Sequence, residues 1–345
     1  MQRILIIRLS ALGDVVMASG LIPALRHLYP HARLSWLVEP AAAPLLKHNP
    51  RLDEVIVWPR AEWQALWREK RYRELLARAR AFRRELRARR FDLVLDAQGL
   101  LKSGVWAWLS GAPKRLGLIA REGSHLLMSE RVLPPPAGAD KPIGSEYRFL
   151  AQHLGAPPEA FQLDLAVGDE PRQAARAVLR DAGVAGRVAA LCPFTTRPQK
   201  HWFEERWAEL ARRLLESGYT PVLLGGPGDR EAAARIAAQV PGLIDLAGRL
   251  KLDQTVAAVA DAALLIGVDT GLTHMGTALG IPTVALFGST RPYLSAGTPR
   301  TVIMYEQLAC SPCKRHPTCD GRFDCMRRHT VDGVIATAQR VLSAA

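Results

Sequence analysis

One aspartate follows shortly after an apolar run that has the composition of a buried strand. Asp14 ends the segment R-L-S-A-L-G-D, which follows R-I-L-I-I, and a helical pattern begins after it. A carboxylate at such a point either favours the positive end of a helix dipole or acts as a general base. The Ser, Ala and Gly around it would let a ligand approach the backbone closely. Asp14 is therefore a candidate general base.

A second polar segment, D-T-G-L-T-H from Asp269 to His274, lies between the apolar runs A-A-L-L-I and T-V-A-L-F-G. A helix opening here presents unpaired N–H groups and its positive dipole end, which together form an anion site. The small residues would let a pyrophosphate reach the backbone, with hydroxyl donors from Thr270 and Thr273 and a ring N–H from His274. The alternative is an ordinary helix with Asp269 as its N-cap and His274 as a satisfied, half-buried residue.

A third polar segment, P-F-T-T-R-P-Q-K-H-W, also follows an apolar run. Its hydroxyls, on Thr195 and Thr196, and its basic side chains suit contacts with phosphates or sugar hydroxyls. Lys200 is placed to neutralise a departing diphosphate. Because the chain has no D-x-D, a sugar-nucleotide enzyme of this type is expected to need no metal.

The elements that must position these residues form two similar halves. With 345 residues, the chain is long enough for two domains. In the first half, strand-like runs (R-I-L-I-I, A-R-L-S-W-L-V, E-V-I-V-W, F-D-L-V-L) alternate with helical patterns, and the second half repeats this alternation. The pattern predicts two α/β domains, 1–160 and 161–345, joined by a linker at about 157–171. Each is expected to hold a mostly parallel sheet whose strands present ligand sites at their carboxyl ends, with a cleft between the domains.

Composition narrows the class of partner. The net charge is +13, from 46 Lys and Arg against 33 Asp and Glu, so anionic partners are favoured: nucleic acid, nucleotides or an anionic membrane. The first apolar run breaks at Arg8, which is too short for a signal peptide, and no stretch approaches a membrane-spanning length. We expect a cytoplasmic protein.

The segment 60–90 is strongly basic and carries apolar residues at helical spacing. These are Tyr72, Leu75, Leu76, Ala79, Phe82 and Leu86. The spacing predicts an amphipathic helix with an apolar face toward a core. Its basic face is either a solvated surface or a site that docks on an anionic membrane.

Four cysteines lie close together near the C-terminus, in C-S-P-C-K-R-H-P-T-C-D-G-R-F-D-C. They are Cys310, Cys313, Cys319 and Cys325, with His316 among them. Reduced thiols or a redox-sensitive pair fit this spacing, and a structural zinc site is the alternative. Cys192 is expected in a core.

The chain resembles the glycosyltransferase family 9 heptosyltransferases, most closely their first type. The resemblance covers essentially the whole chain and rests on five segments in the same order: R-L-S-A-L-G-D-V, D-A-Q-G-L-L-K-S, A-R-E, T-T-R-P-Q-K-H-W and D-T-G-L-T-H. It implies a GT-B fold, with two Rossmann-like domains facing each other across a cleft. It also implies inverting transfer of heptose from ADP-heptose to the Kdo or heptose inner core of lipopolysaccharide, without metal or cofactor.

Carried onto this sequence, the resemblance places Asp14 at the general base. Donor contacts fall on Thr195, Thr196, Lys200, Asp269, Thr270, Gly271 and His274. The acceptor candidates are Lys102 and Arg121, for phosphates or carboxylates of Kdo-lipid A or the inner core. The resemblance and the basic helix together imply peripheral contact with the inner face of the cytoplasmic membrane.

The sequence departs from the family at the donor ribose, where first-type members have an acidic residue soon after a strand. The corresponding loop is G-G-P-G-D-R-E, so the match is Asp229, Glu231 or neither. Another nucleotide-sugar-dependent transferase is the first alternative function. An oxidoreductase or epimerase is disfavoured by the missing G-x-G-x-x-G, and a nucleic-acid-binding protein by the lack of a known reader motif.

Overall fold

The computed structural model describes residues 2–118, 122–133, 141–313 and 315–344. The chain divides into two compact units. Unit 1 comprises Met1–Ala137 and Gly144–Ala166, and unit 2 comprises Gly138–Ile143 and Val167–Ala345. The expected linker at 157–171 spans the point where unit 2 resumes. No helix in the described ranges is both long and apolar enough to cross a membrane.

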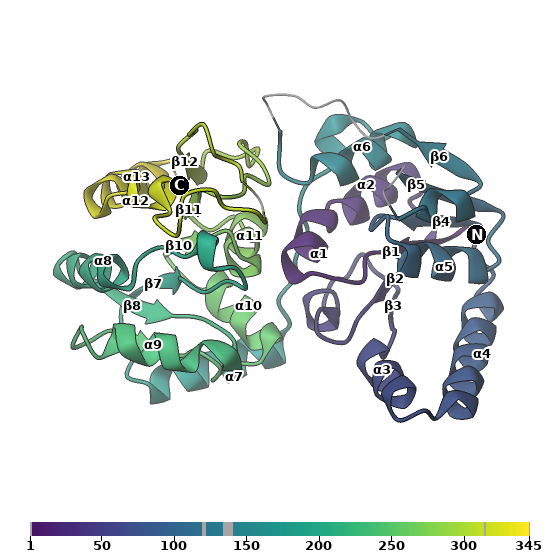
Figure 1. Ribbon diagram of the computed structural model, residues 1–345, viewed down its shortest axis with the longest axis horizontal. Helices are drawn as coiled ribbons and strands as arrows, with labels where there is room; N and C mark the ends of the chain where they lie inside the picture. Colours follow the sequence, from purple (N-terminus) through teal and green to yellow (C-terminus); the bar gives the residue numbers. More distant parts are fainter. Residues whose placement is uncertain (1, 119–121, 134–140, 314, 345) are drawn as a thin grey trace. The chain divides into compact units, whose positions relative to one another are not determined.

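Unit 1 is built on a six-stranded parallel sheet with the order β3-β2-β1-β4-β5-β6. The strands are β1 (Arg3–Ile7), β2 (Arg33–Val38), β3 (Glu54–Val57), β4 (Leu93–Asp96), β5 (Lys114–Leu118) and β6 (Glu130–Val132). Its helices are α1 (Leu12–Ala18), α2 (Leu21–Leu28), α3 (Arg60–Arg68), α4 (Tyr72–Ala88), α5 (Leu101–Leu109) and α6 (Ser145–His153). This order is that of a doubly wound sheet, with helices on both faces (Figure 1). The expected strands in this half are present, and β5 and β6 were not predicted.

The central strand of unit 1 is apolar on both sides because helices cover both. Residues Ile4 to Ile7 of β1 are fully buried, as the continuous apolar run requires. One face packs against an aromatic cluster of Trp58, Trp63, Phe82 and Trp106, whose rings meet edge to face. Edge-to-face contacts of this kind add to the energy of area burial, so the cluster fixes α3, α4 and α5 on the sheet.

The prediction of one amphipathic helix over 60–90 was wrong in two respects. The segment forms two helices, and the chain reverses between them at Lys70, whose φ is 59°. A single straight helix of that length would extend about 45 Å and could not bring both Trp63 and Phe82 into one cluster. In addition, Tyr72 and Leu76 are exposed, so only part of the expected apolar face reaches the core.

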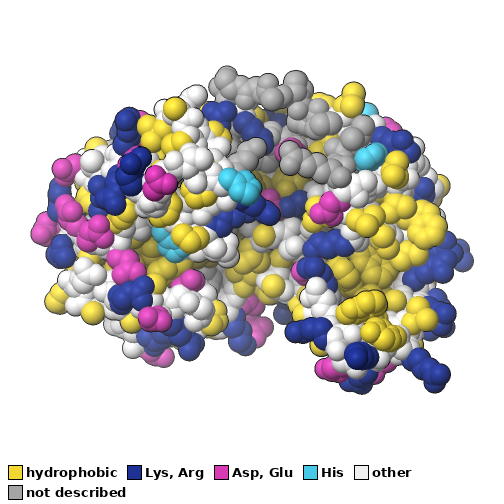
Figure 2. All heavy atoms as spheres, in the orientation of Figure 1, with side chains coloured by type: hydrophobic (Ala, Val, Ile, Leu, Met, Phe, Trp, Pro, Cys, Tyr) yellow, Lys and Arg dark blue, Asp and Glu magenta, His cyan; other side chains and the backbone are white. Residues whose placement is uncertain are grey.

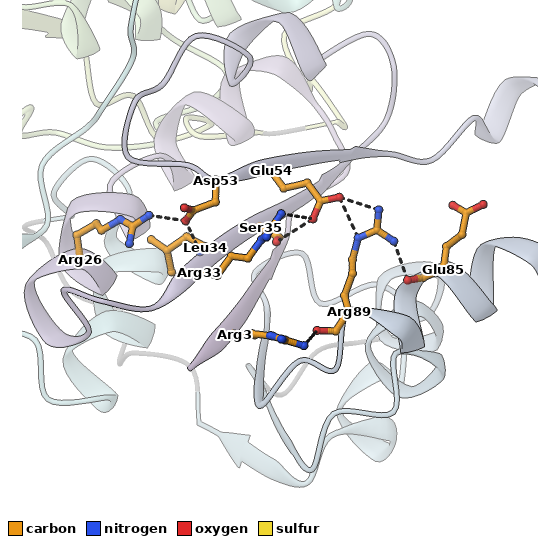
Figure 3. Close-up of polar contacts among 9 residues, drawn as sticks. All are labelled: Arg3, Arg26, Arg33, Leu34, Ser35, Asp53, Glu54, Glu85 and Arg89. Carbon is orange, nitrogen blue, oxygen red and sulfur yellow. Dashed lines mark hydrogen bonds and ion pairs between the residues drawn. The ribbon is translucent and has the colours of Figure 1, made fainter. Parts of the chain in front are cut away.

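Ion pairs lie at the end of the unit 1 sheet where its strands begin (Figure 3). Arg89, at the end of α4, donates to the Glu54 carboxylate at 2.9 and 2.7 Å, and Arg26 contacts Asp53 at 2.6 Å. Arg3 donates to the Arg89 carbonyl at 3.0 Å. These contacts join the starts of β1 and β3 to their helices, so the charges at this edge serve the fold.

Unit 2 repeats the architecture with the order β12-β11-β10-β7-β8-β9, again parallel. The strands are β7 (Arg187–Cys192), β8 (Tyr219–Leu223), β9 (Ile244–Asp245), β10 (Leu264–Val268), β11 (Thr283–Phe287) and β12 (Thr301–Tyr305). The helices are α7 (Asp169–Asp181), α8 (Glu204–Glu216), α9 (Arg230–Ala237), α10 (Leu252–Ala260), α11 (Gly271–Ala278), α12 (Asp324–Arg327) and α13 (Val331–Ser343). The predicted strands of this half are present, while β12 was missed.

Alternate residues of the unit 2 strands enter two separate cores. Leu191 and Ile266 pack with Trp207 on one face, and Cys192 and Leu265 pack on the other, as the two-residue repeat of a strand requires. A short segment of unit 2 precedes its main part: the Ile143 N–H donates to the Ser295 carbonyl at 2.7 Å.

Candidate active site

Asp14 lies in the first turn of α1, just beyond the carboxyl end of β1. Its carboxylate accepts the Ala11 N–H at 3.3 Å and contacts the Arg8 guanidinium at 2.6 Å. The Asp14 side chain is 38% exposed, whereas Arg8 is largely buried. Asp14 thus lies at the positive end of the helix dipole, as one interpretation held, and also presents a carboxylate to solvent, as the other requires.

Arg8 is held in place by several groups of unit 1. Its guanidinium donates to the Ala97 carbonyl at 3.2 Å and lies 5.6 Å from the centre of the Tyr147 ring. Burial alone would lower the pKa of Arg8, but the neighbouring Tyr147 and Asp14 outweigh it and raise that pKa. Arg8 therefore stays charged and holds the Asp14 carboxylate in place through the 2.6 Å contact.

The D-A-Q-G segment stabilises the loop that leads to Asp14. The Asp96 carboxylate accepts the N–H groups of Gln98 and Gly99, both at 3.1 Å, and Gln98 accepts the Leu9 N–H at 2.7 Å. Burial raises the pKa of Asp96, although its hydrogen bonds oppose this. The loop after β4 is therefore tied to the loop after β1, which positions the segment that carries Asp14.

Lys102, an acceptor candidate, lies in the first turn of α5. Its ammonium contacts the Glu39 carboxylate at 2.8 Å, and Arg60 reaches the same carboxylate at 3.4 Å. Glu39, Arg60 and Lys102 follow β2, β3 and β4 at the carboxyl edge of the sheet. Arg121, the other acceptor candidate, lies outside the described residues.

In unit 2, four predicted donor residues meet at one point: Asp269 itself, Lys200, His274 and Thr195. Asp269, which follows β10, receives the Lys200 ammonium at 2.6 Å and lies 3.4 Å from Nε2 of His274. Its backbone carbonyl accepts the Thr195 hydroxyl at 3.4 Å. Thr290, which no sequence signal had marked, donates its hydroxyl to the same carboxylate. The loops after β7, β10 and β11 thus form one polar cluster.

Asp269 is the fixed anion of this cluster. Its side chain is 9% exposed, and burial would raise its pKa. The hydrogen bond and charge of His274, together with the charge of Lys200, outweigh burial and hold the pKa of Asp269 below its usual range. The carboxylate remains ionised and orients Lys200.

The start of α11 differs from the alternative interpretation, in which Asp269 is the N-cap of an ordinary helix. Its N-cap is Thr270, in extended conformation and without a side-chain cap bond, so Asp269 does not cap it. Thr270 and Gly271 are half-buried at the helix start, where the first N–H groups have no partner within the helix. The expectation that Thr273 offers a hydroxyl was wrong, because that hydroxyl is buried and donates to the Val268 carbonyl at 2.6 Å.

His274 and Thr196 occupy contrasting positions. His274 is buried, with Nδ1 2.9 Å from the Tyr293 hydroxyl and Nε2 toward Asp269, so both ring nitrogens face protein groups. Thr196 is exposed in the loop after β7. His274 therefore supports the cluster from behind, while Thr196 is accessible.

The two ribose candidates also differ. Asp229 accepts the Gly226 N–H at 2.7 Å and lies against Gly225, where a Cβ would approach its carboxylate to 3.0 Å. Glu231 is exposed on α9 and pairs with Arg235 at 3.2 Å. Only Asp229 lies in the loop at the end of β8.

The cysteine segment gives no metal ligand set. All five cysteines are free, and no group of three or more His, Cys, Asp or Glu side chains in the described part of the chain could hold a metal ion. Cys192 is buried in the core as expected, and burial raises the pKa of its thiol.

Several site residues were missed from the sequence. Arg8 was noted only as the end of an apolar run, and Glu39 and Arg60 were not singled out as site residues. A common signal would have found them: each directly follows a strand of a parallel sheet, or lies within three residues of its end. Thr290, in the segment after β11, follows the same rule, whereas Tyr293 lies further along that segment.

Comparison with known proteins assigns the family. Residues 79–322 match the family described as glycosyltransferase family 9 (heptosyltransferase). The chain is 32% identical to lipopolysaccharide heptosyltransferase 1 of Pseudomonas aeruginosa, over 99% of this chain and 96% of that protein. It is 29% identical to lipopolysaccharide heptosyltransferase 2 of Escherichia coli K12, over 84% of each chain.

Solved structures agree with this assignment. An Escherichia coli heptosyltransferase, WaaC, solved with ADP-2-deoxy-2-fluoro heptose, is 26% identical, with a TM-score of 0.73 over 98% of this chain and 99% of that one. A family 9 glycosyltransferase from Veillonella parvula is similar in fold, with a TM-score of 0.82 at 22% identity over 100% of this chain and 98% of that one. The predicted GT-B fold class is confirmed. The chain belongs to glycosyltransferase family 9, the heptosyltransferases.

Proposed function

We propose that the protein transfers heptose from ADP-heptose to the Kdo or heptose inner core of lipopolysaccharide, with inversion and without a metal. The observation that carries the proposal is the Lys200–Asp269 pair at the start of α11, in a chain that is 32% identical to lipopolysaccharide heptosyltransferase 1 over 99% of its length. The acceptor is Kdo-lipid A or a core that already bears heptose.

The donor diphosphate would bind at the unit 2 cluster. An ammonium has three N–H donors, and Asp269 uses one, which leaves Lys200 two for phosphate oxygens. The N–H groups at Thr270 and Gly271 add the positive end of the α11 dipole, while Thr195 and Thr196 lie with Lys200 in the loop after β7. These groups would take the role that a metal has in other sugar-nucleotide enzymes, because they neutralise the charge of departing ADP.

Asp14 would act on the acceptor. Its carboxylate takes the proton of the acceptor hydroxyl, and the oxygen forms a bond to the anomeric carbon while the bond from that carbon to the ADP oxygen breaks. Attack opposite the leaving group inverts the configuration, and the proton ends on Asp14. The Arg8 guanidinium, 2.6 Å away, would hold the carboxylate in position for this step.

The acceptor is itself anionic, and basic side chains would hold it. Lys102 and Arg121 are proposed to bind its phosphates or carboxylates, and Lys102 would then exchange its contact with Glu39 for one with the acceptor. Because that acceptor is carried by a lipid, we propose that the enzyme works in the cytoplasm, at the inner face of the cytoplasmic membrane.

The test is release of ADP from ADP-heptose with Kdo-lipid A as acceptor, with and without EDTA. We expect turnover that EDTA leaves unchanged, and a product whose anomeric configuration, read by NMR, is opposite to that of the donor. Thermal unfolding with ADP, UDP or NAD adds an independent measurement, because a ligand of the folded state raises the melting temperature. A shift with UDP or NAD in place of ADP, or a requirement for a divalent cation, would contradict the proposal.

A further inference from the structure

The hairpin of α3 and α4 exposes large apolar side chains at its tip. Trp67, near the end of α3, is 63% exposed, and Tyr72 and Leu76, in the first turns of α4, are each 49% exposed. The Trp67 and Tyr72 rings meet at 5.1 Å, centre to centre, so the tip presents one continuous apolar surface. An open hollow of about 400 Å³, lined by Gln64, Trp67 and Arg68, borders it.

A basic stripe continues from this tip along α4. Tyr72, Leu76, Arg80, Arg83 and Arg87 follow one another at intervals of four, four, three and four residues, which places them on one side of a helix. The three arginines are exposed. Arg80 and Arg83 form no ion pair with any carboxylate of the described chain, and Arg87 donates to the Leu109 carbonyl.

The acidic residues of α4 lie on the opposite flank. Glu74, Arg78 and Glu85 share that flank by the same helical spacing, and Arg78 contacts Glu62 at 3.1 Å and Glu74 at 2.8 Å. Arg71, at the turn, neutralises Glu74 and Glu69. The helix therefore separates a flank on which Glu74 and Arg78 are ion-paired from a flank on which Arg80 and Arg83 have no carboxylate partner in the described chain. Figure 2 shows Lys and Arg side chains along the outer edge of this region.

We infer that this surface, defined by Trp67, Tyr72, Leu76, Arg80 and Arg83, docks the enzyme on an anionic lipid bilayer. Aromatic and aliphatic side chains enter the boundary between headgroups and acyl chains, and arginines beside them contact anionic headgroups. A solvated helix face would not need exposed Trp, Tyr and Leu together at one tip. The inference rests on the proposed function for its occupant, since a lipid-borne acceptor requires an enzyme at the membrane.

Co-sedimentation of the full chain with vesicles tests this surface. We expect binding to vesicles of phosphatidylglycerol and phosphatidylcholine, weakened by salt, and little binding to phosphatidylcholine alone. The double variant Arg80→Glu/Arg83→Glu should reduce partitioning at least about 25-fold, because each basic residue near the surface contributes about fivefold. Trp67→Ser/Leu76→Ser should lower the part of the binding that survives high salt.

The matched control reverses two exposed arginines elsewhere, in Arg180→Glu/Arg212→Glu, with the same change in net charge. These side chains lie on α7 and α8 of unit 2 and have no ion pair in the described ranges. The control should keep binding within about threefold of the parent chain, since exposed charges that do not touch the bilayer are screened. Equal losses in both double variants, or no binding of the parent chain to anionic vesicles, would overturn the inference. Tighter binding of the parent chain to a DNA duplex than to anionic vesicles would also overturn the inference.

Two readouts separate this inference from the proposed function. Each variant should keep the thermal shift with ADP and normal transfer to an acceptor in detergent, because none of these side chains belongs to either polar site. Vesicle binding without any transfer would contradict the proposed reaction and leave the docking surface standing. Transfer in detergent without vesicle binding would contradict only the docking surface.

Discussion

Two aspartates follow strands of similar sheets, and both pair with a cation, yet their surroundings differ. Asp14, beside Arg8, keeps 38% of its side chain exposed, while Asp269, beside Lys200 and His274, keeps 9%. In the first pair the cation is buried and the carboxylate is free to meet a substrate. In the second both partners are largely buried, with the Lys200 side chain 16% exposed, and the carboxylate fixes the position of the cation. The same residue type therefore suits a proton acceptor in unit 1 and a structural anchor in unit 2.

The largest expected effect is on turnover, and it tests the first half of this comparison. Asp14→Asn should lower turnover by about 10²–10⁴-fold, because an amide cannot accept the acceptor's proton. The melting-temperature shift with ADP should persist, since Asp14 lies outside the unit 2 cluster. Asp92→Asn, at the amino edge of the unit 1 sheet, is the control and should leave turnover unchanged. Near-normal turnover of Asp14→Asn would remove Asp14 from its role.

The second half of the comparison predicts a loss of stability. Asp269→Ala leaves Lys200 without its carboxylate in a nearly buried site, so the free energy of unfolding should fall by about 3–5 kcal/mol. Urea unfolding measures this directly. The double variant Asp269→Ala/Lys200→Met should recover part of the loss, because the unpaired charge is gone. A double variant no more stable than the single one would show that the ion pair is not the source.

A smaller effect is expected when only the cation of the cluster is removed. Lys200→Met should weaken donor binding and turnover together by about 10–100-fold, the usual range for a charge-assisted hydrogen bond. Isothermal titration with ADP and steady-state kinetics with ADP-heptose measure the two quantities. Lys251→Met, on an exposed lysine before α10, serves as the matched control. Unchanged ADP affinity in Lys200→Met would place the diphosphate elsewhere.

The smallest expected effect is a decrease, at acid pH, in the contribution of Asp269 to the free energy of unfolding. Because His274 and Lys200 hold the pKa of Asp269 below its usual value, its stabilisation of unit 2 is fully present above about pH 4, the unfolded value. It should decline as the pH falls below that value toward the lowered pKa. Urea unfolding between about pH 5 and pH 3 should show a steeper loss for the parent chain than for Asp269→Ala. Parallel curves would contradict the shift.

The positions of the strands and of the polar loops follow from the sequence where the signal is local. Runs such as R-I-L-I-I and A-A-L-L-I are apolar because both faces of a parallel sheet are covered, and this marks their ends. The strands β5 and β12 were missed because K-R-L-G-L and T-V-I-M-Y lie near the ends of the sheets and are only partly buried. The break at Lys70 was hidden because the charged pattern continues through it.

Contacts between distant residues were less accessible to prediction. The sequence identified Lys102 as a cation behind a strand, but nothing in it indicated that Glu39, 63 residues earlier, would pair with it. In the same way, His274 was predicted as a site residue, while its support by Tyr293 depends on how two loops of unit 2 fold together. Helix and strand patterns determine where a loop begins, and packing decides which side chains meet.

The hydrogen bond from the Ala11 N–H to the Asp14 carboxylate offers an internal reporter of the reaction. An amide that donates to an ionised carboxylate has a different proton chemical shift from one that donates to a protonated acid. In a sample labelled with ¹⁵N at alanine, the Ala11 signal would follow the protonation of Asp14 without any added probe. A spectroscopic titration of that single amide would record whether the residue is charged when acceptor arrives and neutral after ADP departs.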